Sequence, residues 1–167
     1  MGTMNHKIVL ASRPVGLLTP ENFRLETETL SDPGPGEVLV AVETLGVDAF
    51  IRTMLEESAY HGSTPLGGTV TALGVGRVLA SADAALAEGT AVFGPLGAQT
   101  VARLPGVALR PLDVSRVPAT AYLGALGLTT GMTAYVGICY VGAVREGETV
   151  VVSGAAGAVG MMAGQLA

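Results

Sequence analysis

The chain has 167 residues, a net charge of −5, and 49% hydrophobic but only 4% aromatic residues. This length allows one domain, or one domain with part of a second. The acidic balance and the absence of a basic stretch exclude the electrostatic pattern of a nucleic-acid-binding protein. A single cysteine, Cys139, excludes an internal disulfide and a multi-cysteine zinc site. Because the apolar run Ile8–Ala11 is too short for a signal peptide, we expect a cytoplasmic protein.

Short segments separated by glycine and proline turns occupy the first two thirds of the chain. Alternating apolar and polar residues predict strands, and Asp32–Gly36 has the composition of a turn. A short helix is expected from Asp48 to Leu55, with the Asp48 side chain as its cap. The expected strands lie at 6–12, 23–30, 37–47, 69–81, 89–94 and 97–104. This pattern predicts a small, mainly antiparallel β-barrel.

The sequence changes after Pro111, where charged residues become rare. Only Arg145, Glu146 and Glu148 are charged beyond Arg116, so this part is expected to be buried, in a membrane or in protein that this chain does not contain. Helices are expected at 114–126 and 131–142. The segment 117–144 is long enough to span a membrane, but Pro118, five glycines and several threonines interrupt it, which favours two packed helices and no membrane span. We expect two domains, at 1–114 and 115–167.

The last twenty residues combine a strand, a glycine turn and a helix. Thr149–Val152 is a β-branched run without a polar face, as in a strand buried on both sides of a parallel sheet. Three evenly spaced glycines follow, and then a helix at 161–167. Such a corner lets backbone N–H groups approach a pyrophosphate. The spacing is G-x-x-G-x-x-G, with Ala156 where the usual fingerprint has glycine, and tight helix packing alone is the alternative.

Five segments carry a resemblance to a known family: PGPGEVLV (33–40), VDAFIR (47–52), GVGRVLAS (74–81), GMTAYVG (131–137) and GETVVVSGAAGAVG (147–160). They resemble the zinc-independent branch of the medium-chain dehydrogenase/reductase superfamily, in particular NADPH-dependent alkenal double-bond reductases and prostaglandin reductases. The resemblance implies a mainly β N-terminal GroES-like barrel domain, followed by the start of a truncated α/β Rossmann domain. Because family members are about twice as long, it also implies an N-terminal fragment, in which the ribose-reading residue and the catalytic acid lie beyond Ala167.

The family reaction is hydride transfer from NADPH to the β-carbon of an α,β-unsaturated aldehyde or ketone. The resemblance implies NADP as cofactor and an enone or enal as substrate, with no nucleic acid or membrane partner, and a homodimer when full length. It implies no metal, because Val47 and Gly67–Thr69 stand where zinc-dependent relatives have ligands, while His6 and His61 are isolated. The alternatives are a quinone oxidoreductase of the same superfamily and a non-catalytic fragment with an incomplete nucleotide site.

The resemblance also implies which residues contact the ligands. Phe50 and Tyr60 are candidates for the substrate mouth, with Phe50 in place of the family's tyrosine. Thr133 and Met132 are candidates for the nicotinamide side, and the alternative for Thr133 is a plain helix cap. No catalytic residue is assigned. The candidates for the pyrophosphate are Gly154, Ala156, Gly157, Ala158, Val159 and Gly160.

Overall fold

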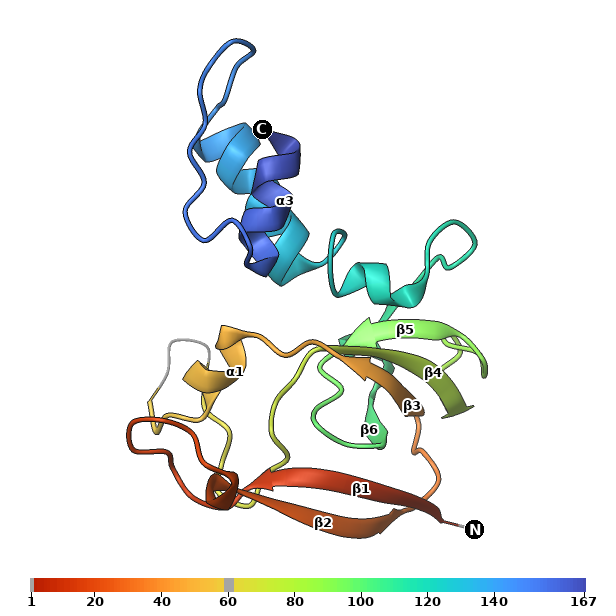
Figure 1. The fold of residues 1–167 in the computed structure, drawn as a ribbon. Coiled ribbons are helices and arrows are strands. Elements are labelled where there is room, and N and C mark those ends of the chain that lie inside the picture. The colour runs from red at the N-terminus through yellow and green to blue at the C-terminus, as the bar shows by residue number, and fades with distance from the viewer. Residues whose placement is uncertain (1, 59–61) are drawn as a thin grey trace. The chain divides into compact units, whose positions relative to one another are not determined.

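The computed structural model describes residues 2–58 and 62–167. The chain divides into two compact units, Met1–Val114 and Ser115–Ala167 (Figure 1). The first unit is mainly β, and the second is helical wherever it has regular structure. This is the expected fold class in outline: a β-rich N-terminal domain followed by a short segment of different character.

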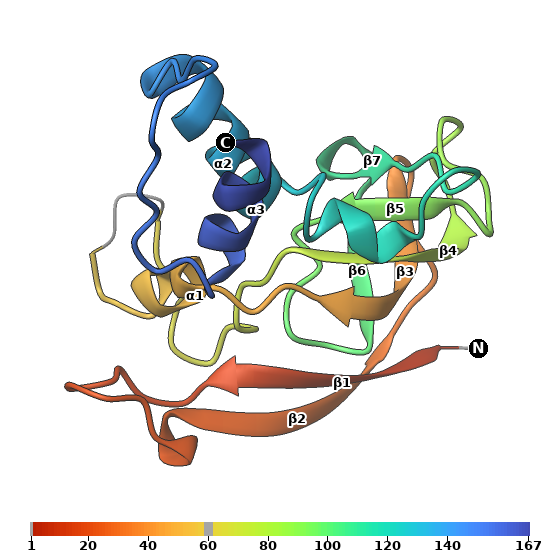
Figure 2. The same cartoon turned by 45° about the horizontal axis from the view of Figure 1, so that its top comes forward.

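Antiparallel strands form the first unit. Strands β1 (Thr3–Leu10) and β2 (Phe23–Leu30) make one two-stranded sheet, seen side by side in Figures 1 and 2. A second sheet has the order β6-β3-β4-β5-β7. Its strands are β3 (Glu37–Leu45), β4 (Gly74–Ser81), β5 (Ala91–Gly94), β6 (Val101–Pro105) and β7 (Arg110–Pro111). Helix α1 (Ala49–Met54) follows β3, and single 3₁₀ turns lie at Pro20–Asn22 and Gly106–Ala108.

Two strands begin later than expected because the chain changes sheets. Thr69 and Gln99 make isolated bridges to β1, with the Val70 N–H donating to the Ile8 carbonyl and the Thr100 N–H to the His6 carbonyl, both at 2.9 Å. Residues 69–70 and 97–100 therefore tie β1 to the larger sheet before β4 and β6 begin. Each of the expected strands 69–81 and 97–104 therefore combines a link to β1 with a strand of the larger sheet. The expected strand 23–30 is confirmed with its bounds.

The core of the first unit is aliphatic. Val38, Leu39 and Val40 in β3 are almost completely buried, since this strand lies between β4 and β6 in the larger sheet. A smaller cluster of Leu10, Leu55 and Val70 packs β1 against the end of α1. The main cluster comprises Val38, Val40, Val78, Leu86, Val92, Leu96, Ala102 and Leu109.

A buried asparagine joins the two sheets. The Asn5 side chain is fully buried on β1. Its amide donates to Glu28 Oε1 at 3.1 Å and to Gln99 Oε1 at 2.9 Å, and its carbonyl oxygen accepts from the Val101 N–H at 3.0 Å. Burial of an amide is tolerated when its hydrogen bonds are made. Asn5 thus fixes the register of β1 on the start of β6.

Replacing Asn5 with alanine is expected to lower the free energy of unfolding by about 3 kcal/mol, because buried polar partners lose their hydrogen bonds. Urea denaturation of the chain at neutral pH measures this change. Thr27→Ala is the matched control, since the Thr27 hydroxyl pairs with His6 at an exposed position of the same hairpin. An Asn5→Ala chain as stable as the control variant would contradict the structural role of Asn5.

A second polar link is an ion pair across β3 and β6. Glu37 Oε2 accepts from Arg103 Nε and from the Gly34 N–H, both at 2.9 Å. These bonds, the Arg103 bond first, hold the pKa of Glu37 below its ordinary value of 4.5. A carboxylate with a lowered folded-state pKa stabilises the fold above its unfolded pKa, and this contribution is lost as the pH falls through the folded value.

The first unit is therefore expected to lose stability as the pH falls below about 4.5. Glu37→Gln removes the titrating group, so the variant's stability should fall less steeply over that range. The urea midpoints of the parent and of Glu37→Gln are measured at pH values from neutral into this acidic range. Equal pH slopes for both would exclude Glu37 as a source of the acid sensitivity.

The second unit differs from its expected elements. The expected helix at 114–126 is reduced to a 3₁₀ turn, Ala119–Tyr122, because Gly124 and Gly127 close a further turn of their own (Gly127 N–H to Gly124 carbonyl, 2.9 Å). The expected helix at 131–142 begins earlier and runs as Leu128–Met132, α2 (Thr133–Tyr135) and Val136–Val141. Its two outer parts have wide π-type turns. Among the described helices, none has the length and apolar character that crossing a membrane requires.

The expected buried strand Thr149–Val152 is wrong for this structure. These residues form no strand, and the Val151 side chain is 89% exposed. A parallel strand is stable only beside a partner that supplies its hydrogen bonds, and no described strand pairs with this segment. The β-branched run therefore lies outside the sheets, between Gly147 and the helix α3 (Ala158–Leu166), with Thr149 and Val151 exposed.

Candidate functional site: the glycine corner before α3

The glycines of the last twenty residues form a corner that leads into α3. Gly154 has φ +63°, a conformation that favours glycine. The Gly157 N–H donates to the Gly154 carbonyl at 2.9 Å and closes the turn. Gly157 is extended, and α3 begins at the next residue, Ala158. The expected turn-to-helix corner is therefore present, although the strand that should precede it is not.

Gly160 lets this corner pack closely. It is buried, and a Cβ placed on it would lie 2.3 Å from the Gly154 carbonyl oxygen and 2.9 Å from the Ala155 Cα. A Cβ on Gly154 would instead meet no atom within 4 Å. Gly160 thus packs the turn onto the first turn of α3, whereas the space beside Gly154 is open, and a Cβ on Gly157 would lie 3.2 Å from the Gly154 carbonyl oxygen.

The start of α3 offers backbone donors. The Met161 N–H makes the first helical bond, to the Gly157 carbonyl at 2.9 Å. The N–H groups of Ala158, Val159 and Gly160 precede it and have no acceptor within the helix. No side chain caps this end, and its first turn has no acidic residue. Ala158 and Val159 are exposed, and their donors, with the positive end of the helix dipole, fit a pyrophosphate.

Thr133 and Met132 lie in the middle of the 128–141 helix. The Thr133 hydroxyl donates to the Leu128 carbonyl at 3.3 Å. The helix-cap alternative for Thr133 is therefore wrong, because the helix begins at Leu128 and the hydroxyl is a donor to a carbonyl. Both side chains are exposed.

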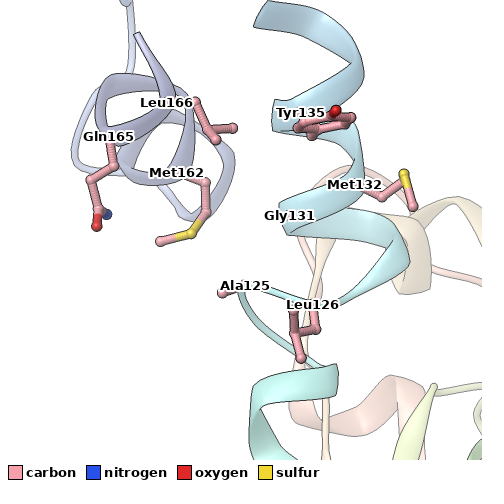
Figure 3. Close-up of a pocket in the computed structure, with 8 residues that line it drawn as sticks. All are labelled: Ala125, Leu126, Gly131, Met132, Tyr135, Met162, Gln165 and Leu166. Carbon is pink, nitrogen blue, oxygen red and sulfur yellow. The ribbon is translucent and has the colours of Figure 1, made fainter. Parts of the chain in front are cut away.

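Met132 belongs instead to an apolar pocket of about 390 Å³ between this helix and α3 (Figure 3). Leu166 and Met162 of α3 face Tyr135 and Gly131 across it. Gln165, which also lines it, donates to the Met161 carbonyl at 3.0 Å. The sequence did not predict this pocket, because its lining is ordinary helix-packing residues. Its chemistry suits hydrocarbon and not phosphate.

The remaining candidates lie in the first unit. The Asp48 carboxylate accepts from the Phe50 N–H at 2.7 Å, which confirms the expected cap of α1. The Phe50 side chain is half-buried. Tyr60 and His61 lie outside the described residues. Within residues 2–58 and 62–167, His, Cys, Asp and Glu side chains form no group of three that would hold a metal ion.

The sequence of the chain matches a known protein family. The family described as the N-terminal domain of oxidoreductase matches residues 6–112. The chain belongs to the medium-chain dehydrogenase/reductase superfamily. The matched segment of this superfamily chain lies within the β-rich first unit, and the glycine corner follows it.

Relatives of this superfamily chain align over nearly its whole length. It is 41% identical to the putative NADP-dependent oxidoreductase YfmJ of Bacillus subtilis (strain 168), over 100% of the chain and 49% of the relative. It is 38% identical to the NADPH-dependent curcumin reductase of Escherichia coli (strain K12), over 97% and 47%. The crystal structure of CurA from Vibrio vulnificus superposes with a TM-score of 0.86 at 34% identity, over 97% and 48%. The chain spans about half the length of these relatives.

Proposed function

We propose that residues 1–167 are the N-terminal part of an NADP-dependent oxidoreductase. It reduces the C=C bond of α,β-unsaturated aldehydes or ketones by hydride transfer, without zinc. The observation that carries the proposal is the open corner at Gly154–Gly160, whose uncapped α3 fits a pyrophosphate. The names of relatives support it: NADPH-dependent curcumin reductase, prostaglandin reductase 1 and 2-alkenal reductase (NADP(+)-dependent). CurA from Vibrio vulnificus also has a structure in complex with NADPH.

In this proposal, 1–114 is a GroES-like substrate domain and 115–167 begins a Rossmann domain. The nicotinamide supplies the hydride when it is bound. The pyrophosphate of NADP would be oriented by the backbone N–H groups of Gly157, Ala158, Val159 and Gly160. Gly154 and Ala156 shape the turn. Thr133 and Met132 line the nicotinamide side. The Phe50 ring forms an apolar wall for the substrate, and Tyr60, which lies outside the described residues, is the second candidate for the substrate mouth.

Zinc-free chemistry is proposed from the residues themselves. Val47, Gly67, Gly68 and Thr69 offer none of the thiolate, imidazole or carboxylate ligands that catalytic zinc requires. Stabilisation of the developing enolate therefore falls to hydroxyl groups or to the cofactor. We also propose a homodimeric full-length enzyme in the cytoplasm.

The test joins residues 1–167 to the second half of the E. coli curcumin reductase and follows NADPH oxidation. Oxidation that depends on a 2-alkenal and persists with a chelator supports the proposal. No NADPH oxidation with any enone overturns it. A quinone reductase is the second candidate, because a quinone oxidoreductase from Pseudomonas syringae matches 97% of the chain with a TM-score of 0.70 at 27% identity. Faster turnover with quinones than with 2-alkenals would favour it.

A further inference from the structure

The β1–β2 hairpin is attached to the rest of the first unit differently at its two ends. At the end that carries the loop, the Leu10 N–H donates to the Gly68 carbonyl at 3.0 Å and the Val70 N–H to the Ile8 carbonyl at 2.9 Å. Leu10 and Val70 also pack against Leu55 in the smaller hydrophobic cluster. Backbone bonds and aliphatic packing carry no titrating group, so this loop end is expected to hold at acidic pH.

The opposite, open end of the hairpin is attached through polar side chains. The fully buried Asn5 amide donates to Glu28 Oε1 on β2 and to Gln99 Oε1 on the segment before β6. Its carbonyl oxygen accepts from the Val101 N–H. Glu28 Oε2 in turn accepts from Lys7 Nζ at 2.7 Å. Both protons of the buried amide are therefore used, and the Glu28 carboxylate fixes how that amide is oriented.

A second carboxylate ties the end of β2 to β6. Arg103 Nη1 donates at 2.6 Å to the hydroxyl of Ser31, the residue that follows β2. The same guanidinium donates from Nε to Glu37 Oε2 at 2.9 Å. Because bonds between a guanidinium and a carboxylate are directional, Glu37 holds Arg103 in the position from which it reaches Ser31. We call the bonds of Asn5, Glu28, Glu37 and Arg103 the polar link.

Both carboxylates of the polar link are more acidic than an ordinary glutamate. The Lys7 bond, followed by the Asn5 bond and the Lys7 charge, outweighs partial burial and lowers the pKa of Glu28 from its ordinary value of 4.5. The Arg103 bond has the same effect on the pKa of Glu37. Such groups stabilise the fold above their unfolded pKa, and this contribution is lost as the pH falls through the folded value. The polar link therefore weakens in acid.

Other charged groups of the hairpin bond elsewhere. The Glu26 carboxylate on β2 accepts from Arg24, and the exposed ring of His6 on β1 bonds to the Thr27 hydroxyl at 3.0 Å. The segment 97–100, which faces the hairpin, has no titrating side chain. The acid response of the open end is thus assigned to the two carboxylates of the polar link.

We propose that acid opens the hairpin at one end: protonation of Glu28 and Glu37 releases Thr3–Lys7 and Ser31 from the larger sheet, while the loop end stays folded. In each case the proton goes to a carboxylate oxygen and removes the charge that a cationic partner binds. The result is a partly opened state of the first unit. It is reached before global unfolding, because the loop end keeps its backbone bonds and its apolar cluster.

Residue-resolved amide hydrogen exchange of the 167-residue chain tests this inference, with protection factors measured from neutral pH to below 4.5. The Val101 N–H reports on the open end, and the Val70 N–H reports on the loop end. As the pH falls, the opening equilibrium constant at Val101 should rise by up to about tenfold per pH unit for each proton taken up. Because it exposes little surface, this opening should hardly depend on added urea, whereas Val70 should show the urea slope of global unfolding.

Two variants assign the protons. Glu28→Gln removes one titrating group but keeps an acceptor for the Asn5 amide. Its pH slope at Val101 should therefore be smaller by one proton, a factor of up to about ten per pH unit. Glu26→Gln is the matched control on the same strand, and it should keep the parent's slope because that carboxylate pairs with Arg24.

Either of two results would overturn the inference. One is an equal opening constant and an equal urea slope for Val101 and Val70 in the parent chain, since the two ends would then open only together. The other is an equal pH slope for the Glu28→Gln and Glu26→Gln chains. The first comparison needs no variant, so it decides the question even if Glu28→Gln does not fold. Neither result bears on the proposed function, because both concern the first unit without a cofactor.

Discussion

Replacing Gly76 with alanine is expected to lower the free energy of unfolding of the first unit by about 4 kcal/mol, at the upper end of single-residue effects. Gly76 lies on β4 opposite Val42, beside a register shift in β3. A Cβ there would lie 2.1 Å from the Ala41 carbonyl oxygen and 2.9 Å from Val40 Cγ1. The oxygen belongs to the backbone of the neighbouring strand β3, so the strand pair itself has to move apart.

Urea denaturation of the 167-residue chain measures this loss, with Gly89→Ala as the control. Gly89 has φ +82°, and a Cβ there would meet no atom within 4 Å. The control therefore isolates backbone strain, about 1–2 kcal/mol for a residue in the left-handed region. If Gly76→Ala costs no more than Gly89→Ala, the close approach of β3 and β4 at Gly76 is not real.

The second large effect is expected at the glycine corner, where Gly160→Val should weaken NADPH binding by about 100-fold, or about 2.8 kcal/mol. A valine would drive its Cβ into the Gly154 carbonyl, 2.3 Å away. The turn must then leave α3, and the backbone donors lose their shared orientation toward the pyrophosphate. Calorimetric titration of the joined enzyme with NADPH gives the two dissociation constants.

The same helix provides the control for this change. Gly164 also lies in α3, and a Cβ there would meet no atom within 4 Å. Gly164→Val is expected to leave NADPH affinity unchanged, because valine is tolerated in a helix better than glycine. Equal affinities of the Gly160→Val variant and the parent would show that the corner does not hold the cofactor.

Local chemistry predicted much of the first unit. In the sequence of β2, Phe, Leu and Thr alternate with charged residues, and Asp48 is a good cap, so both elements appear where the sequence places them, although Leu25 is exposed. A glycine within a strand is typical of a bulge or of a close backbone approach, and Gly76 in β4 shows both features. The transfers of residues 69–70 and 97–100 to β1 were not predictable, because only the tertiary arrangement decides which strand accepts those hydrogen bonds.

The second unit was harder to predict because its regular pattern depends on partners. Thr149–Val152 has the composition of a buried strand, yet a lone strand makes no ladder and remains exposed. The glycine corner needs no partner strand, since its turn closes through Gly154 and Gly157. The anchoring of the loop between β1 and β2 was not predictable either, because Arg13 and Arg52 bind carbonyls 36 to 42 residues away.

The division into two units also separates the charge. Met1–Val114 holds seven cations and twelve carboxylates, and so the whole net charge of −5, while Ser115–Ala167 holds two of each sign. Mutual repulsion between copies therefore arises from the β-rich unit alone. As the solution approaches the isoelectric point near 4.9, this repulsion vanishes, leaving bare aliphatic side chains such as Val141 and Val151 unopposed. Resistance to aggregation and the stability of the fold should consequently both fall in the acidic range, at neighbouring pH values.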